Sequence, residues 1–455
     1  MPATRSPNKR TATENACKVC APLGACIAFK GIEAAVPLLH GSQGCSTYIR
    51  RYLIGHFREP VDIASSSFSE ATAIFGGRDN LFKSLDNIIA QYHPKLIGIA
   101  TTCLSETIGE DVSLYVNQYL EQNAKKPNLP RIVFVSTPSY SGSYSTGFKN
   151  TQLKLIATLA MEQKAKNEYV VFLPTLVSPE DLRHFKTIFN DFGISPVVVP
   201  DYSETLDSGL WEELELIQEG GTPLELIRDA GGARAAIEIA ARPQEDASAG
   251  VLLAKKFGAR LYRQALPVGI GHTDAFFKTL EAISGNNTPP EYLRQRRSLV
   301  DSYVDGHKFL FDKRVVIFGD AELVAGLASF ALETGLKPVI CATGDTGVDL
   351  REILDAAAPK LDKTCIVIED ADFTHIDEAM AQAAVDCIIG SSKGYVLSRK
   401  YKIPLVRVGF PVQDRIGAQR LLHVCYAGTQ QLFERITNAL IEKEQDDSPV
   451  GYMTY

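Results

Sequence analysis

Short apolar runs alternate along the chain with longer stretches whose apolar residues recur at helical spacing. The runs predict strands at 95–102, 131–137, 169–175, 195–201, 314–320, 337–343, 364–370, 386–392 and 403–409. The longer stretches predict helices at 80–92, 178–193, 321–335 and 420–444. In the second of these helices, Ser178 before Pro179 is the order of an N-cap followed by a first-turn proline. Apolar strands that alternate with amphipathic helices indicate buried parallel sheets.

The strand and helix pattern restarts near residues 25, 165 and 312. This repetition predicts an α/β fold of three Rossmann-like domains with mainly parallel sheets. We expect an N-terminal arm at 1–24, followed by α/β domains at 25–164, 165–290 and 291–455, the last of which ends in a C-terminal helix. The polar segments 243–250 and 284–298 are expected to be connections, one within the middle domain and one leading into the third.

Charge and hydropathy exclude two classes of partner. The net charge of -7 and the lack of a long basic tract argue against nucleic-acid binding. No apolar run approaches the roughly 20 residues that a membrane-spanning helix needs. The polar residues 1–15 lack the apolar centre of a secretory signal, so we expect a flexible arm on a cytoplasmic protein. Thiols stay reduced in that compartment, and the 9 cysteines therefore favour packing or metal binding over disulfides.

The cysteines fall into two groups. Those within or beside apolar strand-like runs are expected to pack in the core: Cys341, Cys365, Cys387 and Cys425. Those in segments flanked by Gly, Pro and Ser are candidates for a site: Cys17, Cys20, Cys26, Cys45 and Cys103. Cys103 directly follows the predicted strand 95–102, which is where open α/β sheets bind ligands. Within the second group, the apolar helical pattern around Cys26 favours core packing, and Cys17 remains open between core and ligand.

Several segments of the chain resemble the β-type subunit of nitrogenase component 1. The N-terminal ones are CAPLGACIAFKGIEAAVPLLHGSQGC at 20–45, HFREPV at 56–61, EATAIFGGRDN at 70–80, TTCLSETIGEDV at 101–112 and TPSYSGSYSTGF at 137–148. The later ones are 285–320 and VRVGFPVQDR at 406–415, so that the likeness spans nearly the whole chain. The resemblance implies that three cysteines help to hold an iron–sulfur cluster at the interface with an α-type partner. Those motif positions fall on Cys20, Cys45 and Cys103.

The resemblance also implies a hydroxyl group close to the cluster. That position falls on Ser139, with Ser141 nearby, and an ordinary turn serine is the alternative interpretation. His40 and His56 are expected to make structural hydrogen bonds rather than to bind metal. The carboxylates that follow Cys103 either act on protons near the cluster or cap a helix: Glu106, Glu110 and Asp111.

The number of thiols narrows the type of cluster. A [4Fe–4S] cube usually takes four cysteine thiolates, so three are one short for a cube of the chain's own. Three would suit half of an [8Fe–7S]-type cluster shared with a partner, and a [4Fe–4S] cluster remains the alternative. A zinc site would need a second cysteine pair or histidines at ligand spacing, which the neighbouring sequence lacks. The chain has no P-loop, so ATP hydrolysis is expected in another protein.

Two functions follow from the resemblance. In the first, the chain is the β-type subunit of a nitrogenase-like reductase, with methylthio-alkane reductase as one specific case. The cluster would then relay electrons from an ATP-dependent iron protein to a cofactor in the α-type partner of an α2β2 heterotetramer. In the second, it is a NifN-type scaffold subunit on which the iron–molybdenum cofactor is assembled. The short arm before Cys20 is more like the scaffold, whereas the three retained cysteines favour the relay. A sugar- or nucleotide-binding α/β protein would leave the cysteine spacing unexplained.

Overall fold

The chain was analysed as a computed structural model that describes residues 17–210, 215–241 and 248–450. The predicted flexible arm at 1–15 lies outside the described residues, as do residues 243–247 of the predicted connection.

Three sheets follow one another along the chain, and every pairing between their described strands is parallel. The first sheet has the order β2-β1-β3-β4 and consists of β1 (Ala35–His40), β2 (Ala64–Ser65), β3 (Leu96–Thr101) and β4 (Arg131–Val135). The second has the order β6-β5-β7-β8 and consists of β5 (Asn167–Leu173), β6 (Pro196–Val198), β7 (Ala233–Ile239) and β8 (Arg260–Gln264). The third has the order β11-β10-β9-β12-β13 and consists of β9 (Arg314–Gly319), β10 (Lys337–Thr343), β11 (Ile366–Ile368), β12 (Cys387–Gly390) and β13 (Leu405–Arg407). The predicted α/β class with parallel sheets is thus confirmed.

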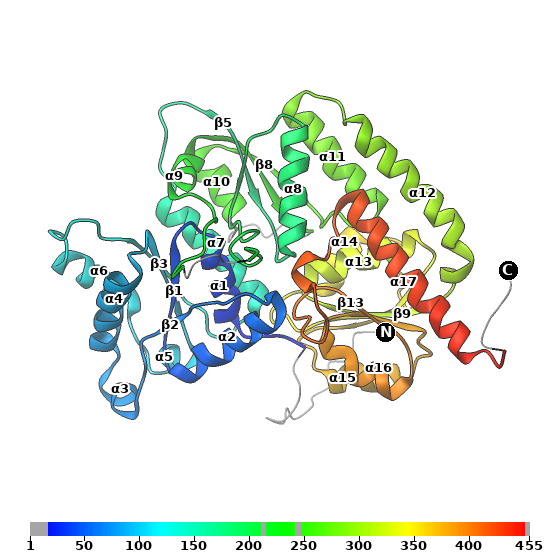
Figure 1. Cartoon of the computed structure of the whole chain (residues 1–455), viewed down its shortest axis with the longest axis horizontal. Helices are drawn as coiled ribbons and strands as arrows, with labels where there is room; N and C mark the ends of the chain where they lie inside the picture. The colour runs from blue at the N-terminus through cyan, green and yellow to red at the C-terminus, as the bar shows by residue number, and fades with distance from the viewer. Residues whose placement is uncertain (1–16, 211–214, 242–247, 451–455) are drawn as a thin grey trace.

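The helices separate and cover the three sheets (Figure 1). Around the first sheet lie α1 (Ala21–Lys30), α2 (Gln43–Phe57), α3 (Glu70–Phe75), α4 (Arg78–Tyr92), α5 (Cys103–Thr107), α6 (Val112–Gln122) and α7 (Tyr144–Leu159). The next part of the chain contains α8 (Pro179–Asp191), α9 (Leu224–Asp229), η1 (Ala230–Gly232), α10 (Ala249–Phe257), α11 (Ile270–Ser284) and α12 (Pro290–Leu310). The last part contains α13 (Ala321–Glu333), α14 (Leu350–Ala357), α15 (Phe373–Met380), η2 (Ser392–Gly394), α16 (Tyr395–Tyr401), η3 (Ala418–Arg420) and α17 (Cys425–Asp447).

Most predicted elements are present with somewhat different ends. The helix expected at 178–193 runs from Pro179 to Asp191, and Ser178 caps it by accepting a hydrogen bond from the amide of Asp181 at 2.9 Å. The strands of each sheet fall within one predicted domain, although the exact domain boundaries stay a prediction. The helix expected at 420–444 begins only at Cys425.

Two kinds of element were missed. The polar segment 284–298 is not simply a connection, because α12 begins at Pro290 and buries Tyr292 and Leu299 while its charged residues face solvent. A proline at the first helical position is compatible with that start. The strands β1, β7 and β8 were also missed, because the proline of β1, the alanines of β7 and the polar residues of β8 weaken the usual strand pattern.

The helix α1 is the structural centre of the first part of the chain. All of its residues are buried, and it packs against β1, β3 and α7. The contact with α7 depends on two glycines: a Cβ on Gly24 would lie 1.8 Å from the carbonyl oxygen of Tyr144, and one on Gly147 would lie 2.0 Å from that of Ala21. The two backbones therefore approach more closely than any other residue allows. Among the described residues, no helix combines the length and the apolar character needed to cross a membrane.

Candidate metal centre

The carboxyl ends of three neighbouring strands bring Cys45, Cys103 and Ser139 to one edge of the first sheet. Because β1, β3 and β4 are parallel neighbours, the loops that follow them start side by side. Cys45 lies in the first turn of α2 after β1, Cys103 is the first residue of α5 after β3, and Ser139 lies in the loop after β4. Both cysteines therefore lie where open parallel sheets usually bind their ligands, beyond the carboxyl ends of the strands.

Cys20 reaches the same edge from a different direction. It is the N-cap residue of α1 and forms an isolated antiparallel bridge with Ser143, next to the start of α7. The hydroxyl of Ser139 accepts a hydrogen bond from the amide of Ala21 at 3.3 Å, and the amide of Ser139 donates to Sγ of Cys103 at 3.3 Å. Ser139 therefore connects the Cys20 segment to Cys103.

Electrostatics indicate that the three thiols are close together. Burial raises the pKa of the Cys20 thiol to about 11; the amide of Leu23 offsets part of this effect, and negative charge at Cys45 and Cys103 adds to it. Three thiolates near one another repel, and a cationic metal cluster would relieve that repulsion. The thiols thus suit a group that deprotonates them.

The arrangement does not suit a single metal ion. Within the described residues, no set of three or more His, Cys, Asp or Glu side chains is placed to hold one ion. Thiolates that bind separate irons of a cluster need not converge on one point. The three cysteines therefore fit a cluster better than a mononuclear site.

The site opens onto the protein surface. Cys45 and Cys103 are exposed, while Cys20 is half-buried. Large apolar side chains on the same loops and helices are also exposed: Tyr48 to 51%, Leu104 to 39% and Tyr140 to 62%. Exposed apolar groups around an incomplete set of ligands are typical of a surface that a partner covers.

Comparison with known proteins assigns the family. The profile of the family described as nitrogenase component 1 type oxidoreductase matches residues 20–441. The chain belongs to the nitrogenase component 1 family. It is 35% identical over 445 residues to a nitrogenase molybdenum-iron protein beta chain of Methanococcus maripaludis, which covers 96% of each chain. It is 33% identical over 431 residues to the beta chain of Clostridium pasteurianum, which covers 94% of this chain and 93% of that one.

The fold agrees with this assignment. A solved chain titled "Nitrogenase Cp1 at pH 6.5" superposes with a TM-score of 0.93 at 31% identity and covers 100% of this chain and 99% of that one. A second, titled "Nitrogenase Cp1 at pH 5", has a TM-score of 0.73 at 12% identity and shares the fold alone. The chain is thus a β-type member of the nitrogenase component 1 family, which is a family of oxidoreductases.

The remaining cysteines of this nitrogenase component 1 chain lie in the core. Cys26 is fully buried, and burial raises the pKa of its thiol. Cys17, which the sequence left open, is also buried, and burial raises its pKa to about 12. The cysteines expected in the core are all buried as predicted: Cys341, Cys365, Cys387 and Cys425.

The histidines and carboxylates near the site make structural contacts. The Nε2 atom of His40 lies 3.1 Å from Oε2 of Glu110, and Nδ1 of His56 accepts a hydrogen bond from the amide of Val412 at 2.9 Å. Asp111 caps α6 by accepting from the amide of Leu114 at 2.9 Å. Glu106 accepts hydrogen bonds from the hydroxyls of two residues next to the site, Thr101 and Ser136.

Several neighbours of the site could not be found from local sequence. A Cβ on Gly41 would lie 2.1 Å from Oγ1 of Thr102, so the loops before Cys45 and Cys103 touch. Lys393, which follows the third sheet, donates to the carbonyl oxygen of Lys18 close to Cys20 and lies over the ring of Tyr52 from α2. These contacts join segments that are distant in the chain and carry no motif, although Gly41 itself is a visible turn signal.

Proposed function

We propose that this chain is the β-type subunit of a nitrogenase-like reductase and holds half of an [8Fe–7S]-type cluster. Cys20, Cys45 and Cys103 would each bind an iron, and Ser139 would stand beside the cluster. The observation that carries the proposal is an incomplete set of three thiols, two exposed and one half-buried, at the carboxyl ends of β1 and β3 and the start of α1. When bound, the cluster would supply one-electron transfer between an ATP-dependent iron protein and a cofactor in an α-type partner.

The chain's own residues prepare each thiol differently. Cys45 and Cys103 are exposed, so iron can reach their sulfur atoms directly. Cys20 has a raised pKa, so it would lose its proton only when iron binds. The amide of Ser139 donates to Sγ of Cys103, and hydrogen bonds to ligand sulfur atoms tune the reduction potential of a cluster. Three thiolates leave some irons of the cluster without a ligand from this chain, and the α-type partner would supply those ligands. We therefore favour the shared cluster over a [4Fe–4S] cube.

The reductase assignment has a further support over the NifN-type scaffold. The short arm before Cys20 suggested the scaffold, but the Methanococcus maripaludis beta chain aligns over 96% of its own length with 96% of this chain. A chain of this extent therefore occurs among nitrogenase molybdenum-iron protein beta chains. We accordingly place the chain in an α2β2 heterotetramer with an α-type subunit, visited transiently by the iron protein.

The test removes one ligand at a time from the copurified complex of this chain with its α-type partner. Cys45→Ala and Cys103→Ala should each lower the iron content per αβ unit and remove or change the low-temperature EPR signal of the oxidised and dithionite-reduced protein. Cys341→Ala and Cys387→Ala are the controls, because these buried thiols should cost only about 1 kcal/mol of packing and leave the iron unchanged. Full iron and an unchanged signal in both ligand variants would refute the site.

Activity measurements on the wild-type complex and on the ligand variants separate the reductase from the scaffold. In a reductase, loss of the cluster should abolish product formation even when the cofactor of the α-type partner is present. In a scaffold, the wild-type complex should form no product and should instead accumulate and transfer a cofactor precursor. Product formation by the wild-type complex with the iron protein and ATP is therefore the deciding measurement.

A further inference from the structure

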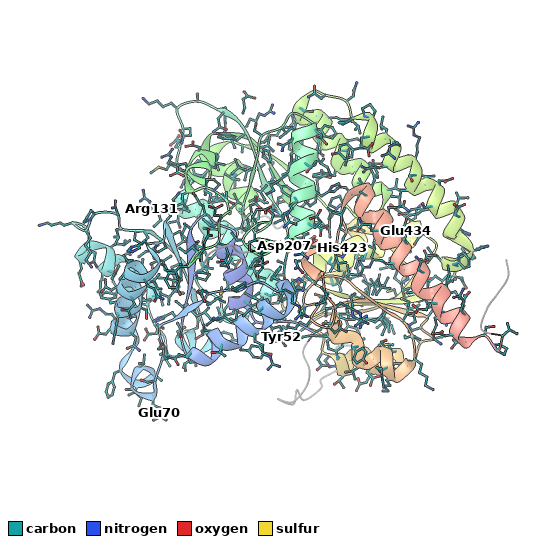
Figure 2. The ribbon with its side chains drawn as sticks, in the orientation of Figure 1. Tyr52, Glu70, Arg131, Asp207, His423 and Glu434 are labelled. Carbon is teal, nitrogen blue, oxygen red and sulfur yellow. The ribbon has the colours of Figure 1, made fainter. Side chains whose placement is uncertain are left out.

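A lysine from the last part of the chain lies close to the Cys20 segment. Lys393 belongs to η2, which follows β12 at the carboxyl end of the third sheet. Its ammonium group donates a hydrogen bond to the carbonyl oxygen of Lys18 at 3.4 Å and lies 5.9 Å from the centroid of the Tyr52 ring. Figure 2 places Tyr52 where α2 faces the part of the chain that carries the third sheet. Lys393 thus lies between the first and third sheets, and its hydrogen-bond partner Lys18 is two positions before the proposed ligand Cys20.

The backbone that leads to Cys20 contacts three neighbouring parts of the chain. The amide of Cys17 donates to the carbonyl oxygen of Ala371 at 3.1 Å, and the carbonyl oxygen of Val19 accepts from the amide of Tyr144 at 3.0 Å. A Cβ on Gly344 would lie 2.4 Å from the backbone nitrogen of Lys18, so the loop after β10 touches the same segment. The segment that leads to Cys20 is therefore fixed against α7 and against the loops of the third sheet, the same sheet that η2 and Lys393 follow.

The charges at this junction favour an interaction between Lys393 and Cys20. Burial lowers the pKa of the Lys393 ammonium, and a thiolate at Cys17 or Cys20 would raise it again in part. Cys17 stays a neutral thiol, because burial raises its pKa to about 12. Burial also raises the pKa of Tyr52, so its phenol stays neutral. Cys20 would be a thiolate once it binds iron, and it is then the sulfur whose charge the ammonium meets.

Building on the cluster proposed above, we infer that Lys393 sets the reduction potential of that cluster by holding a positive charge beside its Cys20 ligand. The reduction potential of an iron–sulfur cluster depends on its net charge, its hydrogen bonds and its exposure to solvent. A cation nearby stabilises the form with one more electron, and partial burial strengthens the effect by lowering the local dielectric constant. Lys393 therefore makes the cluster easier to reduce.

The experiment compares two substitutions in the copurified αβ complex. Lys393→Met removes the charge at similar length, whereas Lys393→Arg keeps it. We expect the midpoint potential of the cluster, followed by EPR during a redox titration, to shift to lower potential in Lys393→Met and to stay near the wild-type value in Lys393→Arg. Lys363→Met is the matched control, because Lys363 is an exposed lysine of the same part of the chain. Its potential should not move.

The outcomes distinguish this inference from the proposed function. Iron content and an EPR signal in the wild-type complex test the cluster itself, before any lysine is changed. With that signal present, an unshifted potential in Lys393→Met would overturn the role of Lys393, as would an equal shift in Lys393→Arg. If Lys393→Met fails to retain iron, Lys393→Gln is read in the same titration, and an unshifted potential there has the same meaning.

Discussion

At the scale of single residues, the proposed ligands differ in how deeply their thiols are buried. Cys20 is half-buried with a thiol pKa of about 11, whereas Cys45 and Cys103 are exposed at helix N-termini. Iron binding must displace the proton of Cys20, so loading of the cluster releases protons and is favoured by higher pH. Cys20 is thus the proposed ligand whose deprotonation should depend most on iron binding.

The buried His56 makes a separate prediction about acid stability. Burial lowers the pKa of His56 from 6.5 to about 3, and its Nδ1 atom accepts from the amide of Val412. Below about pH 6.5 the imidazole of His56 is protonated in the unfolded chain, whereas in the folded chain it stays neutral down to about pH 3. The free energy of unfolding therefore falls by about 1.4 kcal/mol for each unit that the pH drops through this window. The thermal midpoint of the αβ complex should therefore fall less steeply between pH 6.5 and 5 in His56→Gln than in the wild type.

His307→Gln is the control for this measurement, because His307 is exposed. Its midpoint should follow the wild-type curve. Parallel curves for His56→Gln and the wild type would contradict the assignment of a buried neutral imidazole.

At the scale of elements, the contact between α1 and α7 decides where Cys20 lies. Cys20 immediately precedes α1, and Ser143, its bridge partner, immediately precedes α7. The two helices meet through glycines whose missing side chains leave room for the opposing backbone. The position of Cys20, the first proposed ligand, therefore depends on how α1 packs against α7.

This contact predicts the effect of one added methyl group. In Gly147→Ala the new Cβ would lie 2.0 Å from the backbone oxygen of Ala21, so the helices must separate. Overpacking of this kind typically costs about 1–3 kcal/mol, and displacement of the Cys20 segment should also lower the iron content of the complex. Gly326→Ala is the matched control, since its Cβ would meet Leu266 at an ordinary 3.4 Å. Wild-type iron and thermal stability in Gly147→Ala would show that the contact is not needed.

At the scale of the whole molecule, α12 presents an apolar face that none of the described residues covers. Large apolar residues at helical spacing are exposed along it or at its end: Leu293, Val300, Val304 and Phe311. A second copy of this chain in the proposed α2β2 heterotetramer would cover these apolar residues.

The proposed α2β2 assembly can be tested on this face. Val304 is 72% exposed, so Val304→Asp should fold normally but place a charge in the apolar contact between the two copies. We expect the variant complex to elute as an αβ unit at about half the wild-type mass in light scattering, with its iron unchanged. Val450→Asp provides a control at another exposed valine. An intact tetramer in Val304→Asp would move the contact to another surface.

The sequence alone determined the α/β class, all five strands of the third sheet and the cysteines that belong to the core, because these depend on local hydrophobic pattern. Its motifs also singled out Cys20, Cys45, Cys103 and Ser139. Only the tertiary structure brought these residues to one edge, because their approach depends on the parallel order β1-β3-β4 and on the glycine contact between α1 and α7. The position of Lys393 near Cys20 was likewise decided by the packing of η2 against the segment before α1. Such a contact between distant segments produces no hydrophobic periodicity that the sequence could reveal.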